Sequence, residues 1–167
     1  AVPARLREFA AGRAAARDAM AALGLPTAAV PMAPDRAPVW PAGLCGSISH
    51  CDRACLAAVT RLGGVRGLGG VRGLGLDLEP DAALPPDLWD SLFSTTELAA
   101  LAGWETPLQG RFALVMFSAK EAVYKAQYPL SGRLFGFDGV RFRLIRRRAG
   151  LARGSHCKPG LSGRGTG

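Results

Sequence analysis

Apolar residues recur at three- and four-residue steps along two stretches of the chain, and this period predicts amphipathic helices. The first stretch runs from Arg5 to Leu23 and is followed by Gly24, a natural C-terminal stop. The second runs from Arg111 to Tyr128. In this second helix we expect a buried stripe made of Val115, Ala119, Ala122, Val123 and Ala126, with Lys120, Glu121 and Lys125 toward the other side.

Runs of small and apolar residues predict strands at 55–60, 75–80 and 135–144. We expect residues 46–50, Gly-Ser-Ile-Ser-His, to form a loop. Residues 25–43 are rich in proline and have no period, so we expect a loop there. Pro85 and Pro86 mark a link between two halves of the chain. Ser94 and Glu97 have the spacing of a capping box, which gives Glu97 a structural role at a helix start. A carboxylate near a metal is the alternative for Glu97.

The charge of the chain changes this picture by pointing to an anionic partner. The 167 residues carry a formal net charge of +8, nearly all of it from arginine. Such a balance suits nucleic acid, an acidic protein face or a phosphorylated small molecule. No apolar run reaches the roughly 18 residues that a membrane crossing needs. The chain opens on Ala1 without a signal peptide, which predicts a cytoplasmic location.

The four cysteines are irregularly spaced and predict reduced thiols, in agreement with a cytoplasmic protein; they are Cys45, Cys51, Cys55 and Cys157. A zinc site is the alternative, with Cys45, Cys51 and Cys55 joined by His50. It lacks the paired Cys-x-x-Cys spacing of most structural zinc sites.

Three carboxylates stand where a divalent cation would suit them. Asp77 and Glu79 are two apart in an expected strand, so both side chains leave one face. Glu121 and Lys125 are four apart in the second helix and therefore share a face. Carboxylates with a lysine suit magnesium bound to a substrate phosphate. Each motif alone has a common alternative, a solvated strand edge or a surface ion pair worth about 0.3–0.5 kcal/mol.

For several other basic and polar residues, both a binding role and a structural role stay open. Arg13 and Arg17 are four apart, so they form either a solvated basic face or an anion site. Arg36 lies in the proline-rich loop, ahead of Trp40, which we expect to be a buried anchor. A lone histidine such as His50 is more often structural than catalytic.

Residues 64–75 repeat one six-residue unit in tandem, Gly-Val-Arg-Gly-Leu-Gly. Both dinucleotide and P-loop patterns fail here, because the third glycine and the Gly-Lys-Ser/Thr element are missing. We expect a duplication that lengthens a surface hairpin at little cost in stability. Beyond residue 144 the chain is rich in Gly and Arg, with no period, which predicts a disordered tail.

Four motifs in order make the chain resemble the 4'-phosphopantetheinyl transferases. They are Gly-Ser-Ile-Ser-His at 46–50, Gly-Leu-Asp-Leu-Glu-Pro at 75–80, Leu-Phe-Ser-x-x-Glu at 92–97 and Phe-Ser-Ala-Lys-Glu-Ala-Val-Tyr-Lys at 117–125. The likeness covers about residues 5–144 and is greatest to the bacterial subfamily that serves siderophore and other nonribosomal peptide or polyketide synthases. Phe117 departs mildly, since the family often has tryptophan there.

The resemblance implies an α+β fold of two similar halves related by a pseudo-twofold axis. Each half would be a long helix packed on a small antiparallel sheet, with the active site between them. We expect an N-terminal half at 1–84, a C-terminal half at 85–144 and a basic tail at 145–167. Family members usually continue with further strands, so the tail resembles a truncated or frame-shifted end.

The resemblance also implies a reaction: transfer of the 4'-phosphopantetheine arm from coenzyme A to a serine of an acyl or peptidyl carrier protein, with release of 3',5'-ADP. Magnesium would be held by Asp77, Glu79 and Glu121. Glu121 would also act as the base, and Lys125 would neutralise developing charge. The coenzyme A phosphates would lie against Arg13, Arg17, Arg36, Ser49, His50 and Lys120. We expect a monomer in the cytoplasm.

Two other functions stay open at this stage. One is an inactive or truncated transferase that only binds coenzyme A, because the repeat or the tail has cost it turnover. The other is a basic nucleic-acid-binding protein, built on the charge and the Gly/Arg tail. The second leaves the Asp-x-Glu and Lys-Glu motifs unexplained.

Overall fold

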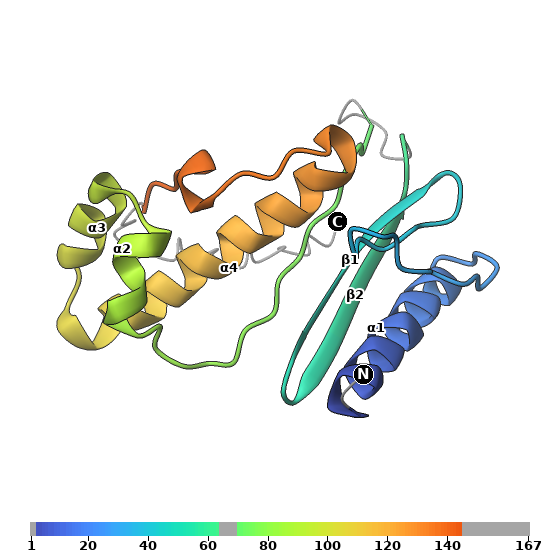
Figure 1. The fold of residues 1–167 in the computed structure, drawn as a ribbon, viewed down its shortest axis with the longest axis horizontal. Coiled ribbons are helices and arrows are strands. Elements are labelled where there is room, and N and C mark those ends of the chain that lie inside the picture. Colours follow the sequence, from blue (N-terminus) through green and yellow to red (C-terminus); the bar gives the residue numbers. More distant parts are fainter. Residues whose placement is uncertain (1–2, 64–69, 145–167) are drawn as a thin grey trace, which may run out of the picture.

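The computed structural model describes residues 3–63 and 70–144. It contains helix α1 (Pro3–Ala22), strands β1 (Leu44–Cys51) and β2 (Ala54–Arg61), and helices α2 (Trp89–Leu92), α3 (Thr95–Ala102) and α4 (Thr106–Ser131) (Figure 1). Two short 3-10 helices, η1 (Pro86–Leu88) and η2 (Phe137–Gly139), complete the elements. Among the described helices none is both long and apolar enough to cross a membrane. The fold is α+β, as predicted.

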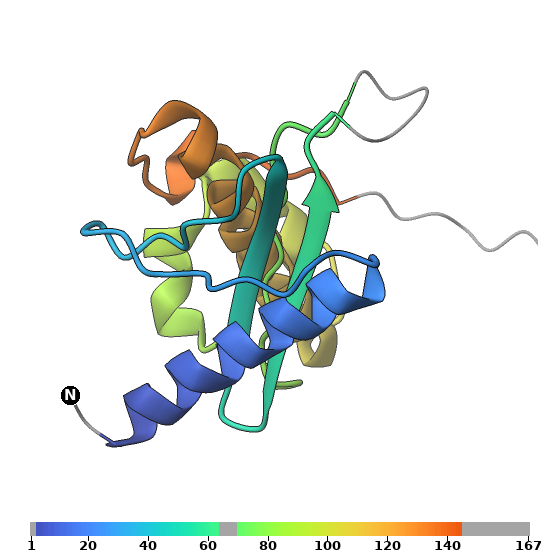
Figure 2. The same cartoon turned by 90° about the vertical axis from the view of Figure 1, so that its right-hand side faces the viewer.

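Helix α1 packs on an antiparallel hairpin formed by β1 and β2 (Figure 2). Ala16, Met20 and Val30 are buried in the small core between them. Gly12 allows the close approach, because a Cβ on it would come within 2.8 Å of the Ile48 side chain. Ile48 therefore faces α1, while Ser47 and Ser49 leave β1 on the opposite face, which puts two hydroxyls toward the rest of the molecule.

The second core lies at the other end of the molecule, where α2 and α3 meet the first half of α4 (Figure 1). Its buried residues are Leu84, Phe93, Leu101, Ala113 and Met116. The predicted capping box at the start of α3 is confirmed. The Ser94 hydroxyl accepts from the amide of Glu97, and the Glu97 carboxylate accepts from the amide of Ser94.

An extended segment, 70–84, joins the hairpin to the second core and runs along α4. Gly73 and Gly75 lie directly against the helix, because a Cβ on either would overlap a backbone carbonyl, that of Ala126 or Ala122. These glycines belong to the second copy of the repeated unit. The first copy, 64–69, lies outside the described residues. The second copy is therefore a packing element that seats Asp77 beside α4.

The loop predicted at 46–50 is wrong, because these residues lie in strand β1. Two predicted strands are also wrong. Residues 75–80 are extended but unpaired: the Leu76 carbonyl accepts from the Ser47 hydroxyl (3.4 Å), and the Leu78 amide donates to the Ser49 hydroxyl (3.2 Å). Serine side chains thus replace the ladder bonds that would have made a third strand. Residues 135–144 form η2 and irregular chain instead of a strand. The described residues contain a single two-stranded sheet, so a second sheet and the pseudo-twofold relation are not confirmed there.

The predicted buried stripe of α4 is also wrong in part. Val115 and Val123 are 60% and 37% exposed, whereas Ala113, Met116 and Lys120 are buried. The helix is apolar on more than one side, so its composition did not identify the side that packs on α3. The predicted disorder of 145–167 falls outside the described residues.

Candidate active site

Asp77, Ser49 and Lys125 meet where the extended segment passes between β1 and α4. The Lys125 Nζ lies 2.5 Å from Asp77 Oδ1 and 3.1 Å from the Ser49 hydroxyl. That hydroxyl donates to Asp77 Oδ1 over 2.9 Å. Because the three residues come from three separate parts of the chain, this contact closes the junction between the hairpin and the long helix.

Asp77 is nearly buried at this junction, its side chain being 4% exposed. Burial would raise the pKa of Asp77, but hydrogen bonds and the charge of Lys125, together with Ser49, bring it below its ordinary value. The second oxygen, Oδ2, is buried and has no hydrogen-bond partner within the described ranges. A buried carboxylate oxygen without a partner is costly and marks a place for a further ligand.

Glu79 and Glu121 add further negative charge at the junction where Asp77 lies. Burial, and then the nearby charge of Asp77, raise the pKa of Glu79. Burial raises the pKa of Glu121 as well; Lys125 opposes this and Asp77 adds to it. A cation placed among these carboxylates would relieve the repulsion between them.

The carboxylates do not form a finished metal cage. In the part of the chain that the structure describes, no three His, Cys, Asp or Glu side chains are arranged to hold a metal ion. This finding includes Asp77, Glu79 and Glu121, and Lys125 donates to one oxygen of Asp77. It includes equally the zinc alternative, because Cys45, His50, Cys51 and Cys55 do not form such a group in the described structure.

A pocket of about 300 Å³, the basic pocket, gathers three of the predicted binding residues: Arg13, Arg36 and His50. Arg13 lies over the Phe9 ring, 4.4 Å from its centre, and burial lowers its pKa. Its Nε is buried without a hydrogen-bond partner among the described residues. An unpaired buried guanidinium nitrogen suits an anionic ligand. Arg17 is exposed one turn further along α1 and does not line this pocket.

Arg36 has a left-handed backbone, with φ of 73°. It follows Pro34 and Asp35 in a tight loop closed by a hydrogen bond from the Arg36 amide to the Ala33 carbonyl (2.8 Å). This conformation costs a residue other than glycine roughly 1–2 kcal/mol. Strain of this kind is most often retained at functional sites.

The structure separates the side chains of Ser49 and His50, the two residues of β1 that the resemblance places against the coenzyme A phosphates. They are neighbours on β1 and face opposite sides of the hairpin. His50 faces α1 and lies 4.0 Å from Glu8, whereas the Ser49 hydroxyl is fully engaged at the Asp77 junction.

A second pocket of about 300 Å³, the central pocket, lies between the hairpin and α4. Arg36, Pro38 and Ile48 line both it and the basic pocket. On the α4 side it is lined by Tyr124, Lys125 and Tyr128, among others. The two tyrosine rings stack with centres 5.7 Å apart. The central pocket thus leads from the basic pocket to Lys125.

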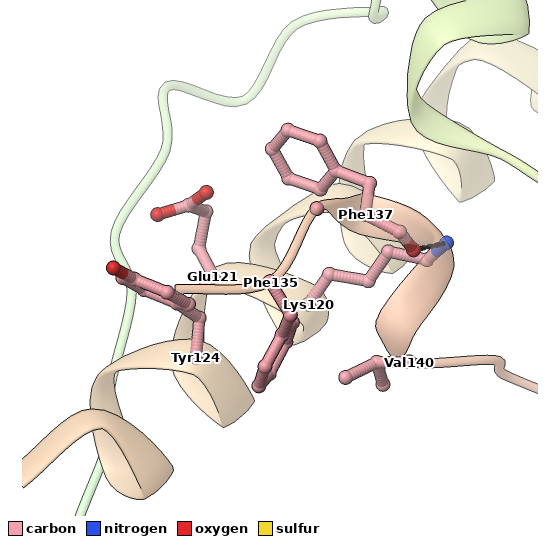
Figure 3. A pocket seen from close by; sticks show the side chains of 7 residues that line it. Lys120, Glu121, Tyr124, Phe135, Phe137 and Val140 are labelled. Carbon is pink, nitrogen blue, oxygen red and sulfur yellow. Dashed lines mark hydrogen bonds between the residues drawn. The ribbon is translucent and has the colours of Figure 1, made fainter. Parts of the chain in front are cut away.

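A smaller pocket of about 180 Å³, the aromatic pocket, lies beyond Tyr124 and beside Glu121 (Figure 3). Phe135, Phe137 and Val140 form its apolar wall. Tyr124 meets Phe135 edge to face, with ring centres 5.6 Å apart. Tyr124 therefore separates the aromatic pocket from the central pocket and lines both.

Lys120 is not placed as predicted. Its side chain is 2% exposed and points away from Glu121 (Figure 3). The ammonium group donates to Glu97 (2.9 Å) and to the carbonyls of Leu92 (2.9 Å) and Phe137 (2.8 Å). An ammonium group has three hydrogens, so all are directed at protein acceptors and none is left for a phosphate.

Asp35, Tyr124 and Tyr128 were missed at the sequence level. Tyr128 donates from its hydroxyl to Asp35 Oδ2 over 2.8 Å, although 93 residues separate them. Period alone assigned Tyr124 and Tyr128 to the end of a helix. The spacing of Tyr124, Lys125 and Tyr128 on one side of α4 was the available signal.

Comparison with known proteins gives two family matches that together cover most of the chain. Residues 1–60 match the 4'-phosphopantetheinyl transferase N-terminal domain, and residues 73–162 match the 4'-phosphopantetheinyl transferase superfamily. The second match alone covers more than half of the 167 residues.

Individual relatives agree with the family matches. The 4'-phosphopantetheinyl transferase Svp of Streptomyces mobaraensis is 40% identical over 145 residues, 83% of this chain and 54% of Svp. Npt of Nocardia iowensis is 38% identical, over 80% of this chain and 57% of Npt. Enterobactin synthase component D of Salmonella typhi is 37% identical, over 82% of this chain and 54% of that protein. The chain spans about half the length of these relatives.

Proposed function

The chain belongs to the 4'-phosphopantetheinyl transferase superfamily, and from this premise we propose that it transfers the 4'-phosphopantetheine arm of coenzyme A to a carrier protein. The acceptor is a serine hydroxyl of an acyl or peptidyl carrier protein, and the leaving product is 3',5'-ADP. The relatives named as transferases support this reaction class.

The observation that carries the proposal is the order of the three pockets. The basic pocket, the central pocket and the aromatic pocket share lining residues in sequence, so they form one row along the junction. Cationic side chains line one end, Lys125 lines the middle and apolar rings line the other end. Such a row suits an elongated ligand that has phosphates at one end and an uncharged arm at the other.

Within this row we assign the phosphates of the nucleotide to Arg13, Arg36 and His50. Arg17 is exposed on α1 and would contact these phosphates only at the rim of the basic pocket. Ser49 supports the site by holding Asp77 and Lys125 together, which differs from direct phosphate binding. Lys120 we assign to the structure of the C-terminal half. We place coenzyme A binding mainly in residues 1–84 and the reacting side chains of α4 in 85–144.

Glu121 is the base that takes the proton of the attacking serine. Its raised pKa favours this role, because a carboxylate with a raised pKa accepts a proton more readily near neutral pH. Lys125 lies at the centre of the row and neutralises charge that develops on the oxygens of the transferred phosphoryl group. The protein contributes positioning and charge, with no covalent intermediate required.

The residues fit a magnesium ion in their chemistry. Asp77, Glu79 and Glu121 supply hard oxygen donors, and the unpartnered Oδ2 of Asp77 is one of them. Magnesium usually takes only one or two protein carboxylates and completes its shell with phosphates and waters, so a preformed cage is not required. When bound, the ion would neutralise charge on the pyrophosphate.

The partner would be an acidic protein face in the cytoplasm. The chain carries a formal net charge of +8, and carrier proteins present acidic helices. Complementary charge of this kind speeds encounter and weakens with salt. Enterobactin synthase component D among the relatives favours a peptide synthetase of siderophore assembly as the source of the carrier. We propose that the chain acts as a monomer.

The test is transfer of a fluorescent pantetheine arm from labelled coenzyme A to a panel of carrier proteins, with magnesium and with a chelator. Magnesium-dependent labelling of a carrier serine is the expected result. Glu121→Gln should label at least about a hundredfold more slowly. Normal turnover by that variant would exclude Glu121 as the base.

Binding of coenzyme A is measured in parallel, because it separates two kinds of failure. Binding without labelling would contradict the transferase proposal and leave a protein that only binds coenzyme A. Absence of both binding and labelling would contradict the assignment of the row of pockets to coenzyme A.

A further inference from the structure

We propose that the hydrogen bond between Asp35 and Tyr128 is a clasp that holds the loop 33–37 against α4 and so positions Arg36 for an anionic group of the nucleotide. Asp35 and Tyr128 are positioning residues, since they act through Arg36. The inference rests on the proposed function and adds two residues to the same site.

The loop has a defined geometry that begins with its backbone. The Arg36 amide donates to the Ala33 carbonyl (2.8 Å), and the Ala33 amide donates to the Ala37 carbonyl (2.9 Å). Asp35 Oδ1 accepts from the Ala37 amide (3.0 Å). A tight loop followed by one left-handed residue normally has glycine at that position, and here it has Arg36, with φ of 73°. The turn therefore needs contacts beyond its own backbone to stay in place.

The clasp supplies a contact from the opposite side of the central pocket. The other oxygen of Asp35, Oδ2, accepts from the Tyr128 hydroxyl over 2.8 Å. The Tyr128 ring is itself fixed by stacking on Tyr124. One carboxylate thus holds the turn with one oxygen and α4 with the other. Asp35, Arg36 and Tyr128 all line the central pocket, so the clasp borders the space that Arg36 faces.

The clasp also gives the acidic side chain of Asp35 a structural role in this site. Both oxygens of Asp35 accept hydrogen bonds, one from the Ala37 amide and one from the Tyr128 hydroxyl. Asp35 is exposed, and the hairpin and α4 are already joined through Asp77 and Lys125, so the clasp is not needed for the fold.

The experiment compares Tyr128→Phe, which removes only the hydroxyl, with Ser131→Ala, which removes an exposed hydroxyl from the same helix away from the pockets. Amide hydrogen exchange is followed in the ligand-free protein at Ala33, Arg36 and Ala37. Tyr128→Phe should speed this exchange and weaken coenzyme A binding by about three- to tenfold, with kcat unchanged within about twofold. Ser131→Ala should change neither.

A double-mutant cycle with Arg36→Ala tests whether the clasp acts through the arginine. In the Arg36→Ala background, Tyr128→Phe should change the Kd of coenzyme A by less than about twofold. An equal loss in both backgrounds would overturn the positioning role, and so would exchange rates that Tyr128→Phe leaves unchanged. If the wild-type chain binds no coenzyme A, the proposed function fails and this role fails with it. The exchange measurement then still shows whether the hydroxyl holds the loop.

Discussion

Two lysine–carboxylate pairs lie on α4 within two turns of each other, and they are built in opposite ways. Lys120 pairs with Glu97 over 2.9 Å, with both side chains 2% exposed or less. Lys125 pairs with Asp77 over 2.5 Å, with the lysine 28% exposed. The sequence pattern placed the two lysines toward the same side of the helix, whereas the structure separates them.

The pairs differ in how completely their polar atoms are satisfied. Lys120 donates to three protein acceptors, and both oxygens of Glu97 are used, because Oε1 accepts from the Phe142 amide (2.9 Å) and Oε2 from Lys120. Asp77 retains an oxygen without a partner in the described part of the chain and has two glutamates with raised pKa values beside it. A satisfied buried pair stabilises a structure, whereas an unsatisfied, crowded pair is typical of a reactive site.

The largest expected effect is on the satisfied pair. Lys120→Met should lower the free energy of unfolding by about 3–5 kcal/mol, because it leaves the Glu97 charge buried without its counterion. Urea unfolding followed by circular dichroism measures this loss. A loss below about 1 kcal/mol would show that Lys120 is not a structural residue.

The next largest effect is on the rate of transfer and concerns the unsatisfied pair, Asp77 and Lys125. Asp77→Asn should slow transfer by about 10²–10³-fold and change the free energy of unfolding by less than about 1 kcal/mol, because it also removes repulsion from Glu79 and Glu121. Asp81→Asn is the control, since Asp81 lies on the same segment and is largely exposed. Equal rates for both variants would contradict the division of roles.

Gly75 links the two pairs by seating the acidic segment on α4. Gly75→Ala should cost about 1–3 kcal/mol of stability and reduce transfer, since the new methyl overlaps the Ala122 carbonyl and displaces Asp77. Gly103→Ala is the matched control, because its Cβ would meet only the Ala100 carbonyl at 3.4 Å. Transfer at the wild-type rate in Gly75→Ala would show that the segment need not lie against α4.

The smallest effect is a change of stability with pH, which should have opposite directions for Glu97 and Glu121. Burial would raise the pKa of Glu97, but the Phe142 amide, Lys120 and Ser94 hold it below its ordinary value of 4.5. Its stabilisation is therefore complete above that value and is lost as the pH falls through the lower pKa of the folded state. Glu97→Gln should destabilise the protein at pH 7, and the difference should shrink in acid.

Glu121 should show the opposite dependence of stability on pH. Its pKa is raised above the ordinary 4.5, so the folded state binds the proton more tightly and loses stability as the pH rises through the raised pKa. Glu121→Gln, which resembles the protonated acid, should be more stable than the wild type at pH 7, and the gain should vanish below pH 4.5. Thermal unfolding across this range measures both variants. A change in stability of the same sign for Glu97→Gln and Glu121→Gln at pH 7 would contradict the comparison of the two pairs.

Local patterns predicted the elements whose formation depends on near neighbours. The first helix, the strand at 55–60 and the capping box at Ser94 follow from period and spacing, and all are present. The second helix is longer than predicted because Pro107 can start a helix, while Gly132 ends it with φ of 61°. Pro129 lies inside the helix near its C-terminal end, where it lacks the amide that would donate to the carbonyl of residue 125.

Features that depend on distant partners could not be predicted this way. A strand needs a neighbouring backbone, and residues 75–80 contact serine side chains and α4 instead. Lys120 is buried because Glu97 meets it from another helix. Asp35 meets Tyr128 across 93 residues of chain. Of the site residues in the family motifs, Ser49, Glu79, Glu121 and Lys125 converge around Asp77, whereas His50 and Lys120 do not. The loop that holds Arg36 became visible only in three dimensions.

The central claim is that the unsatisfied Asp77–Lys125 pair is the reactive centre. The most direct measurement is a calorimetric titration of magnesium into the protein preloaded with coenzyme A, for the wild type, Asp77→Asn and Asp81→Asn. The account predicts saturable uptake of magnesium by the wild type and Asp81→Asn and its loss in Asp77→Asn. Equal magnesium uptake by Asp77→Asn and the wild type would contradict it.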